Sequence, residues 1–188
     1  MRAYEFLQNF SFLASLPGIT SMHLNVTAVG GKDGKSRFEC WQLSTPLDQS
    51  GQFGLVGTAA SFLGDVGNMT YGVIPAGYEG EFHTAPIVQW IIVLNGMSRI
   101  VLADNSTFTV SNDGGESSFL FFADTPAVSR QGHKNYYPGD TETIFLQIPT
   151  RDGKIPEHRV LLDDAPCTSA EFVGLRSLAS ASCSDQSF

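Results

Sequence analysis

The sequence predicts an all-β domain, a sandwich or a closed jelly roll, with a short helix near each end. Between Pro17 and Pro149, short apolar or alternating segments recur, and turn residues separate them at intervals of roughly 8–12 residues. Strand-favouring aromatic residues are plentiful, with 14 Phe and 5 Tyr, while 19 Gly and 9 Pro supply the turns. No segment between these two prolines has the apolar spacing of a helix.

The chain of 188 residues suits one domain. We expect a single domain over 1–188, with a barrel core at about 20–150 and a C-terminal extension over 151–188. Apolar residues at helix spacing predict the first helix over residues 3–16. A capping box from Thr168 to Glu171 predicts the second at about 169–180, with Cys167 and Phe172 as its hydrophobic staple.

The strand pattern follows the chain in order. Glycine and lysine residues at 30–35 form a turn that joins the first two strands as a hairpin. Asn95-Gly96 is the strongest two-residue hairpin signal and predicts that the strands on either side of it pair. The Gly-, Pro- and Ser-rich segment 45–67 is predicted to wrap the barrel or a partner subunit. The predicted strands are 23–29, 37–43, 68–75, 87–94, 97–103, 107–111, 118–123, 133–137 and 143–149.

Composition and charge exclude several classes of function. The formal net charge is −8, and the basic residues are scattered, so we expect no nucleic-acid partner. No apolar run is long enough to span a membrane, and the N-terminus does not resemble a signal peptide. The three cysteines have no metal-like spacing. They are therefore predicted to be reduced, in a cytoplasmic protein.

The stretch from Gly77 to Gly96 places ligand-type residues next to a core strand. His83 precedes an apolar run over 87–94 that Gln89 interrupts. Because strand residues alternate between faces, Trp90 should face away from the side that Gln89 occupies. A polar side chain in a core strand is a local conflict of the kind found at functional sites. We therefore expect this strand to line the barrel interior and to carry half of a metal or ligand site.

The spacing of this stretch resembles the first motif of the cupin family, which reads Gly, five residues, His-x-His, three or four residues, Glu, six residues, Gly. This chain has Gly77, five residues, His83-Thr84-Ala85, three residues, Gln89, six residues and Gly96. The sequence from His83 to Gln89 is similar to the "HxAPxxQ" pattern of a subgroup of small microbial cupins.

A second match lies downstream. Asp124-Thr125 and Gly132-His133 resemble the "EDT…GKGH" segment of the same subgroup, although the Pro-x-Gly that usually precedes the ligand histidine is absent. The resemblance covers roughly residues 36–150. It implies the cupin double-stranded β-helix, a jelly-roll barrel with its site inside.

The resemblance also implies a ligand set. Cupins usually hold a divalent metal with three His and one Glu, and the matching positions here are His83, Gln89 and His133. Ala85 stands where a further ligand His belongs and cannot ligate. A divalent metal (Fe, Zn, Mn or Ni) would then be held weakly, because a neutral amide adds no charge. Alternatively the site is metal-free, with both histidines acting as bases or hydrogen-bond donors, or the pocket is vestigial.

Other candidates have weaker support. Arg130, three residues before His133, is a candidate for binding a substrate carboxylate or phenolate; the alternative is a surface loop charge. Tyr137 is a candidate proton donor if alternation turns it inward; the alternative is core packing. The catalytic candidates are thus His83, His133, Arg130 and Tyr137. Asp124 is expected to cap a loop, and His158 is expected in a polar tail.

Two functions stay open. The first is an enzyme acting on a small apolar molecule, an isomerase, cyclase or dioxygenase of secondary metabolism by analogy with cupins, since histidine can do acid–base work near neutral pH. The second is a non-catalytic cupin that binds a small ligand as a carrier or sensor. Apolar residues in 45–67 and in the N-terminal segment are candidates for a homodimer interface.

Overall fold

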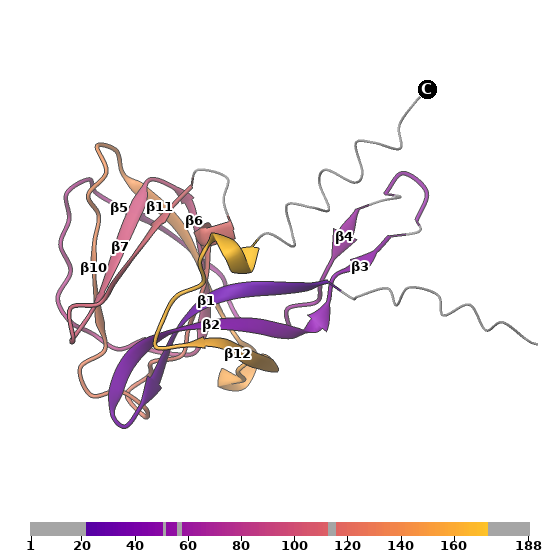
Figure 1. Ribbon diagram of the computed structural model, residues 1–188. Helices are drawn as coiled ribbons and strands as arrows, with labels where there is room; N and C mark the ends of the chain where they lie inside the picture. The colour runs from indigo at the N-terminus through magenta and orange to yellow at the C-terminus, as the bar shows by residue number, and fades with distance from the viewer. Residues whose placement is uncertain (1–21, 51, 56–57, 113–115, 173–188) are drawn as a thin grey trace, which may run out of the picture.

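The computed structural model describes residues 22–50, 52–55, 58–112 and 116–172. Its strands form two main sheets that face each other, which confirms the predicted all-β class (Figure 1). The helix predicted over 3–16 lies outside the described residues, as does the part of the second predicted helix after Phe172. Within the described part of the chain, no helix is long and apolar enough to cross a membrane.

The larger sheet has the strand order β12-β2-β1-β9-β6-β11-β5, and the smaller has β10-β7-β8. A third, two-stranded element is the β3–β4 hairpin. The large-sheet strands are β1 (His23–Lys32), β2 (Lys35–Pro46), β5 (Thr70–Ile74), β6 (Gln89–Asn95), β9 (Phe119–Phe122), β11 (Thr143–Pro149) and β12 (His158–Asp163). The others are β3 (Asp48–Gln49), β4 (Ala59–Ala60), β7 (Met97–Leu102), β8 (Thr107–Ser111) and β10 (His133–Tyr136). Short 3₁₀ turns lie at Glu116–Ser118 and Arg151–Gly153.

A further segment, residues 77–83, borders the smaller sheet along β10. The Gly80 N–H donates to the Asn135 carbonyl at 2.8 Å, and His83 and His133 exchange backbone hydrogen bonds of 2.8 and 2.9 Å. With this segment included, the layers read β5-β11-β6-β9 and 77–83-β10-β7-β8, so the chain repeatedly crosses between sheets. This order is consistent with a jelly roll.

The turn at Asn95-Gly96 does not join a hairpin, so that prediction is wrong. It leads from β6 in the larger sheet to β7 in the smaller one. Gly96 has a φ of 80°, and a Cβ added there would lie 2.6 Å from Thr143 Oγ1. The turn is as tight as the sequence indicates, but it redirects the chain between layers.

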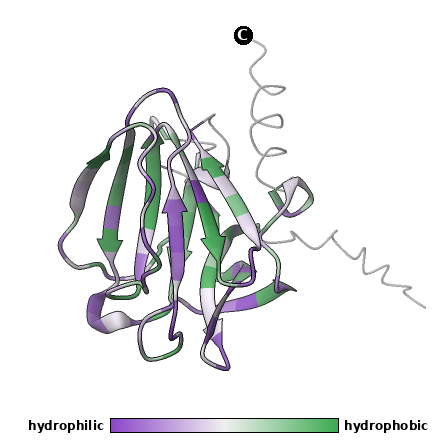
Figure 2. Ribbon diagram, turned by 90° about the vertical axis from the view of Figure 1, so that its left-hand side faces the viewer, coloured by the Kyte–Doolittle hydropathy of each residue, from purple (hydrophilic) through white to green (hydrophobic). Residues whose placement is uncertain are grey.

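The larger sheet has an apolar core on each face. Between the sheets, the core includes Phe38, Ile100 and Leu120. On the outer face, Trp90 stacks on Phe119 with ring centroids 4.7 Å apart, so it faces away from the inter-sheet side as predicted. Figure 2 shows strands that are mostly hydrophobic beside others that are mostly hydrophilic on the side turned toward the viewer.

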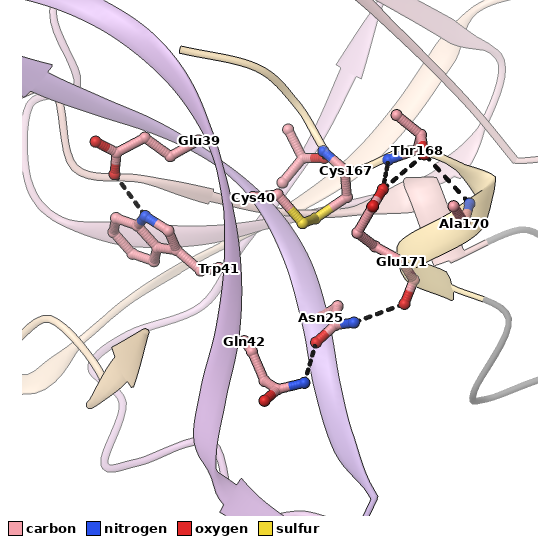
Figure 3. The surroundings of a disulfide bond; sticks show 10 residues. Asn25, Glu39, Cys40, Trp41, Gln42, Cys167, Thr168, Ala170 and Glu171 are labelled. Carbon is pink, nitrogen blue, oxygen red and sulfur yellow. Dashed lines mark hydrogen bonds between the residues drawn. A yellow bond between two sulfur atoms is a disulfide. The ribbon is translucent and has the colours of Figure 1, made fainter. Parts of the chain in front are cut away.

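Cys40 and Cys167 form a buried disulfide (Figure 3), so the prediction of reduced cysteines is wrong. The two residues are 127 positions apart, and only the folded chain brings the segment after β12 against β2. Disulfides are typical of oxidising environments. The predicted cytoplasmic location therefore loses the argument on which it rested.

The capping box is confirmed. The backbone N–H and the hydroxyl of Thr168 donate to the Glu171 carboxylate at 2.7 and 2.6 Å, and the Ala170 N–H donates to the Thr168 hydroxyl at 3.2 Å (Figure 3). These bonds to Thr168 lower the pKa of Glu171. Cys167 and Phe172 share one buried cluster, as the predicted staple requires.

The segments around His158 and around Phe53 both contain strands. His158, predicted to lie in a polar tail, instead begins β12 at the edge of the larger sheet and stacks on Trp41 at 3.7 Å. The β3–β4 hairpin projects from the body of the molecule (Figure 1), and Phe53 between its strands is 99% exposed. The homodimer predicted to use this segment stays a prediction.

Candidate functional site

A cavity of about 380 Å³ lies between the two sheets. Apolar side chains of both sheets form much of its wall, among them Ile91, Ile100 and Leu120. Four of the residues singled out in the sequence also line it: His83, Gln89, His133 and Tyr137. Ala85 lies in the same wall and offers no ligating atom. The structure thus brings the motif residues from distant segments to one place.

His133, at the start of β10, is held by a buried carboxylate. Its Nδ1 lies 2.7 Å from Asp124 Oδ2, with only 3% and 0% of the two side chains exposed. Because an ionised carboxylate only accepts hydrogen bonds, Nδ1–H is the donor, and Nε2 is left for the cavity. Ser36 Oγ donates to the same carboxylate oxygen at 2.8 Å.

A hydroxyl and a glycine complete this support. Ser129 Oγ lies 2.8 Å from Ser36 Oγ and accepts the Gly132 N–H at 3.0 Å. Gly132 has a φ of 75°, and a Cβ added there would lie 1.9 Å from the His83 carbonyl oxygen. Only glycine therefore allows the chain before His133 to approach His83 this closely.

His83 reaches the cavity from the facing segment. Its Nδ1 lies 2.9 Å from the Glu81 carbonyl oxygen. A carbonyl can only accept, so Nδ1–H donates and Nε2 is again the nitrogen left over. The two imidazole centroids are 4.6 Å apart, and the Phe122 ring lies 4.7 Å from that of His133. Two imidazoles therefore stand side by side at an apolar wall.

Gln89 opens β6 at this end of the cavity. It is 5% exposed and pairs in register with Phe122, whose ring contacts His133. Among the described residues, its side-chain amide has no hydrogen-bond partner. A buried amide without a protein partner is available to a ligand.

Tyr137 lies at the other end of the cavity. It follows His133 by four residues, so at about 3.4 Å per residue the two Cα atoms are on the order of 13 Å apart. Burial raises the pKa of Tyr137 to about 12, and a hydrogen bond from Ser98 offsets part of that rise. The phenol therefore stays protonated at neutral pH.

The structure does not bring Arg130 to the cavity. The turn from Thr125 to Ser129 points Ser129 inward, at 2% exposure, and leaves Arg130 exposed. The Arg130 N–H donates to the Gly34 carbonyl at 3.0 Å, beside the β1–β2 turn. This location fits the alternative interpretation, a charge on a surface loop.

Asp124 is the functional residue that the sequence interpretation missed. It was expected to cap a loop, but its side chain binds His133 and Ser36 inside the protein. Its other oxygen, Oδ1, has no hydrogen-bond partner among the described residues. A carboxylate directly after the apolar strand 118–123 and nine residues before His133 was the available signal.

In the part of the chain that the structure describes, no group of three or more His, Cys, Asp or Glu side chains is placed to hold a metal ion. The candidate donors are therefore two imidazoles and one carboxamide. Comparison of the chain with known protein families finds no matching family, and comparison with curated proteins finds no match either.

Proposed function

We propose that this chain is an enzyme that transfers protons on a small organic molecule bound in the cavity, in a reaction of the isomerase or cyclase type. The observation that carries the proposal is the buried Asp124–His133 pair, whose imidazole borders an apolar cavity beside His83. Cavities with apolar walls and a few converging polar groups are typical ligand sites, and 380 Å³ lies at the small end of their size range.

His133 is the proposed general base. Asp124 accepts its Nδ1–H at 2.7 Å, which directs the Nε2 lone pair outward and stabilises the imidazolium that forms when Nε2 takes a proton. Ser36 and the Ser129–Gly132 contact hold the carboxylate and the loop in place. The pair needs no further partner to accept a proton from a carbon or hydroxyl group.

His83 is the proposed second proton carrier. Its ring lies 4.6 Å from that of His133, so both can reach neighbouring atoms of one small molecule. A proton leaves one substrate atom for Nε2 of His133, and the imidazolium of His83 returns a proton to another atom. The product is an isomer, and one proton exchange between the rings or with solvent restores the starting state. No oxidant or other co-reactant is needed.

Membership of the cupin family is part of the proposal, and the motif residues in this cavity support it. A metal-dependent variant has specific support too. Both imidazoles donate Nδ1–H to protein oxygens, as metal-bound histidines usually do. His83, His133 and Gln89 would then hold a divalent ion, which would supply Lewis-acid activation of a carbonyl or dioxygenase chemistry. Three neutral donors bind a divalent ion more weakly than a donor set that includes a carboxylate.

Deuterium exchange into the methyl group of acetophenone tests the proposal, measured by ¹H NMR in D₂O with metal content determined on the same chelator-treated protein. The wild type should accelerate exchange, and His133→Gln should lose at least about a hundredfold of it. His158→Gln, which changes a histidine of the outer face, should retain the activity.

The other outcomes separate the alternatives. Binding without exchange would refute the enzyme and favour a carrier or sensor. Exchange that survives His133→Gln would refute the role of His133. Exchange that is lost on chelation and restored by one ion per chain would favour the metal-dependent variant.

A further inference from the structure

The cavity has a second polar end that the proposed proton transfer does not use. Ser98, 7% exposed, and Tyr137 both line the cavity there. Thr143 lines the same end, but its hydroxyl is occupied, donating to the Met97 carbonyl at 3.0 Å and accepting the Met97 N–H at 3.1 Å. The hydroxyls of Tyr137 and Ser98 can each donate a hydrogen bond to a ligand or accept one from it.

The wall between the two ends combines apolar side chains with carboxamides. Ile91, Ile100 and Leu120 provide the apolar surface. Asn135 on β10 and Gln147 on β11 line the cavity from opposite sheets, and among the described residues their amides have no hydrogen-bond partner. Amides and hydroxyls bind uncharged oxygen and nitrogen groups, because they carry both donors and acceptors.

The charges of the residues that line the cavity also favour an uncharged ligand. Of the described residues, no lysine or arginine lines the cavity, and its one acidic residue is the exposed Glu81. Away from the two histidines, a carboxylate or phosphate on a ligand would be buried without a cationic partner, which is costly. The cavity is therefore suited to uncharged molecules.

We propose that the substrate is an uncharged molecule with an oxygen-bearing group at each end, one beside the His83–His133 pair and the other bound by the hydroxyls of Tyr137 and Ser98. The inference rests on the proposed function for the role of the histidine end. At the other end it assigns Tyr137 to substrate binding. Because Tyr137 follows His133 by four residues along an extended segment, a ligand needs two separate polar groups to reach both ends, as a para-substituted ring provides.

Three matched probes test this with the intact protein: acetophenone, 4-hydroxyacetophenone and 4-acetylbenzoate. Dissociation constants are measured by calorimetry or NMR titration. The hydroxyl of 4-hydroxyacetophenone should tighten binding about three- to tenfold relative to acetophenone, the value of one neutral hydrogen bond. The carboxylate should weaken binding at least about tenfold relative to acetophenone.

Two variants test whether Tyr137 causes the tighter binding of 4-hydroxyacetophenone. Tyr137→Phe should bring the affinity for 4-hydroxyacetophenone to that for acetophenone, whereas Tyr136→Phe, at a residue outside the cavity lining, should keep the difference. Equal or tighter binding of 4-acetylbenzoate, a hydroxyl preference that survives Tyr137→Phe, or no binding of any probe would overturn the inference.

Binding and exchange are measured separately, so the two proposals can fail separately. The predicted affinity order without deuterium exchange would refute the proposed proton transfer and leave the substrate class intact. Exchange that depends on His133, without a preference for the hydroxyl probe, would refute the substrate class alone.

Discussion

The two faces of the larger sheet use neighbouring residues in opposite ways. On the outer face, Trp90 stacks on Phe119 and lies edge-on to Phe121 at 4.5 Å, leaving the rings closely packed. On the inner face, Gln89, the residue before it, borders a cavity of about 380 Å³. Close packing serves stability, whereas an open cavity lined by apolar side chains and a few polar groups is typical of a ligand site.

The histidines show the same contrast. His158 lies flat on Trp41 at 3.7 Å, and its Nδ1 donates to the Pro156 carbonyl at 2.8 Å. His133 donates Nδ1–H to a carboxylate instead and borders the cavity. The residue type is the same, but only the surroundings of His133 support proton transfer. Position in the fold therefore decides which of these two histidines is a candidate for proton transfer.

The largest expected effect is a change in the free energy of unfolding when Trp90 or its neighbour Gln89 on β6 is replaced. Trp90→Ala should lower the free energy of unfolding by about 3–5 kcal/mol, because it leaves a cavity in the ring stack. Gln89→Leu, of similar size, should change it by less than about 1 kcal/mol or raise it, since the amide has no bond to lose. Urea unfolding of both variants measures the difference. A loss in Gln89→Leu as large as that in Trp90→Ala would refute the contrast between the faces.

A smaller change in the free energy of unfolding is expected at high pH. The pKa of Tyr137 is about 12 in the folded protein, against about 10 for an unfolded tyrosine. The folded state therefore holds the proton more tightly, and this contribution to stability is full below about pH 10 and lost as pH rises toward 12. Its size is at most about 3 kcal/mol.

Unfolding measured from about pH 9 to pH 12 should show a steeper loss of stability in the wild type than in Tyr137→Phe. Tyr71→Phe is the matched control, because Tyr71 on the edge strand β5 is 60% exposed. If the Tyr137 and Tyr71 variants lose stability in parallel with the wild type, Tyr137 is not buried as described.

Much of the fold could be predicted because strand signals are local. Alternation and turn residues predicted the main strands. Alternation also placed Gln89 and Trp90 on opposite faces of the larger sheet. The resemblance to the cupin motifs implied that His83, Gln89 and His133 belong to one site, and all three line one cavity.

The rest depends on contacts between distant residues. Asn95-Gly96 reveals a tight turn, but which sheet receives the next strand depends on the whole topology. The Cys40–Cys167 bond spans 127 positions, and β12 pairs with β2 only once the chain has closed on itself. Asp124 could be assigned to His133 only when both were seen in space, and the exposure of Arg130 depends on the turn before it.

The central claim is that Asp124 holds the Nδ1–H of His133 and leaves Nε2 as a proton acceptor at the cavity. Nitrogen-15 NMR of the histidine side chains, followed toward high pH, reports which ring nitrogen carries the proton in the neutral ring, with His133→Gln used to assign the signal. We predict the Nδ1–H form for His133 in the wild type. A neutral His133 with its proton on Nε2 would contradict it.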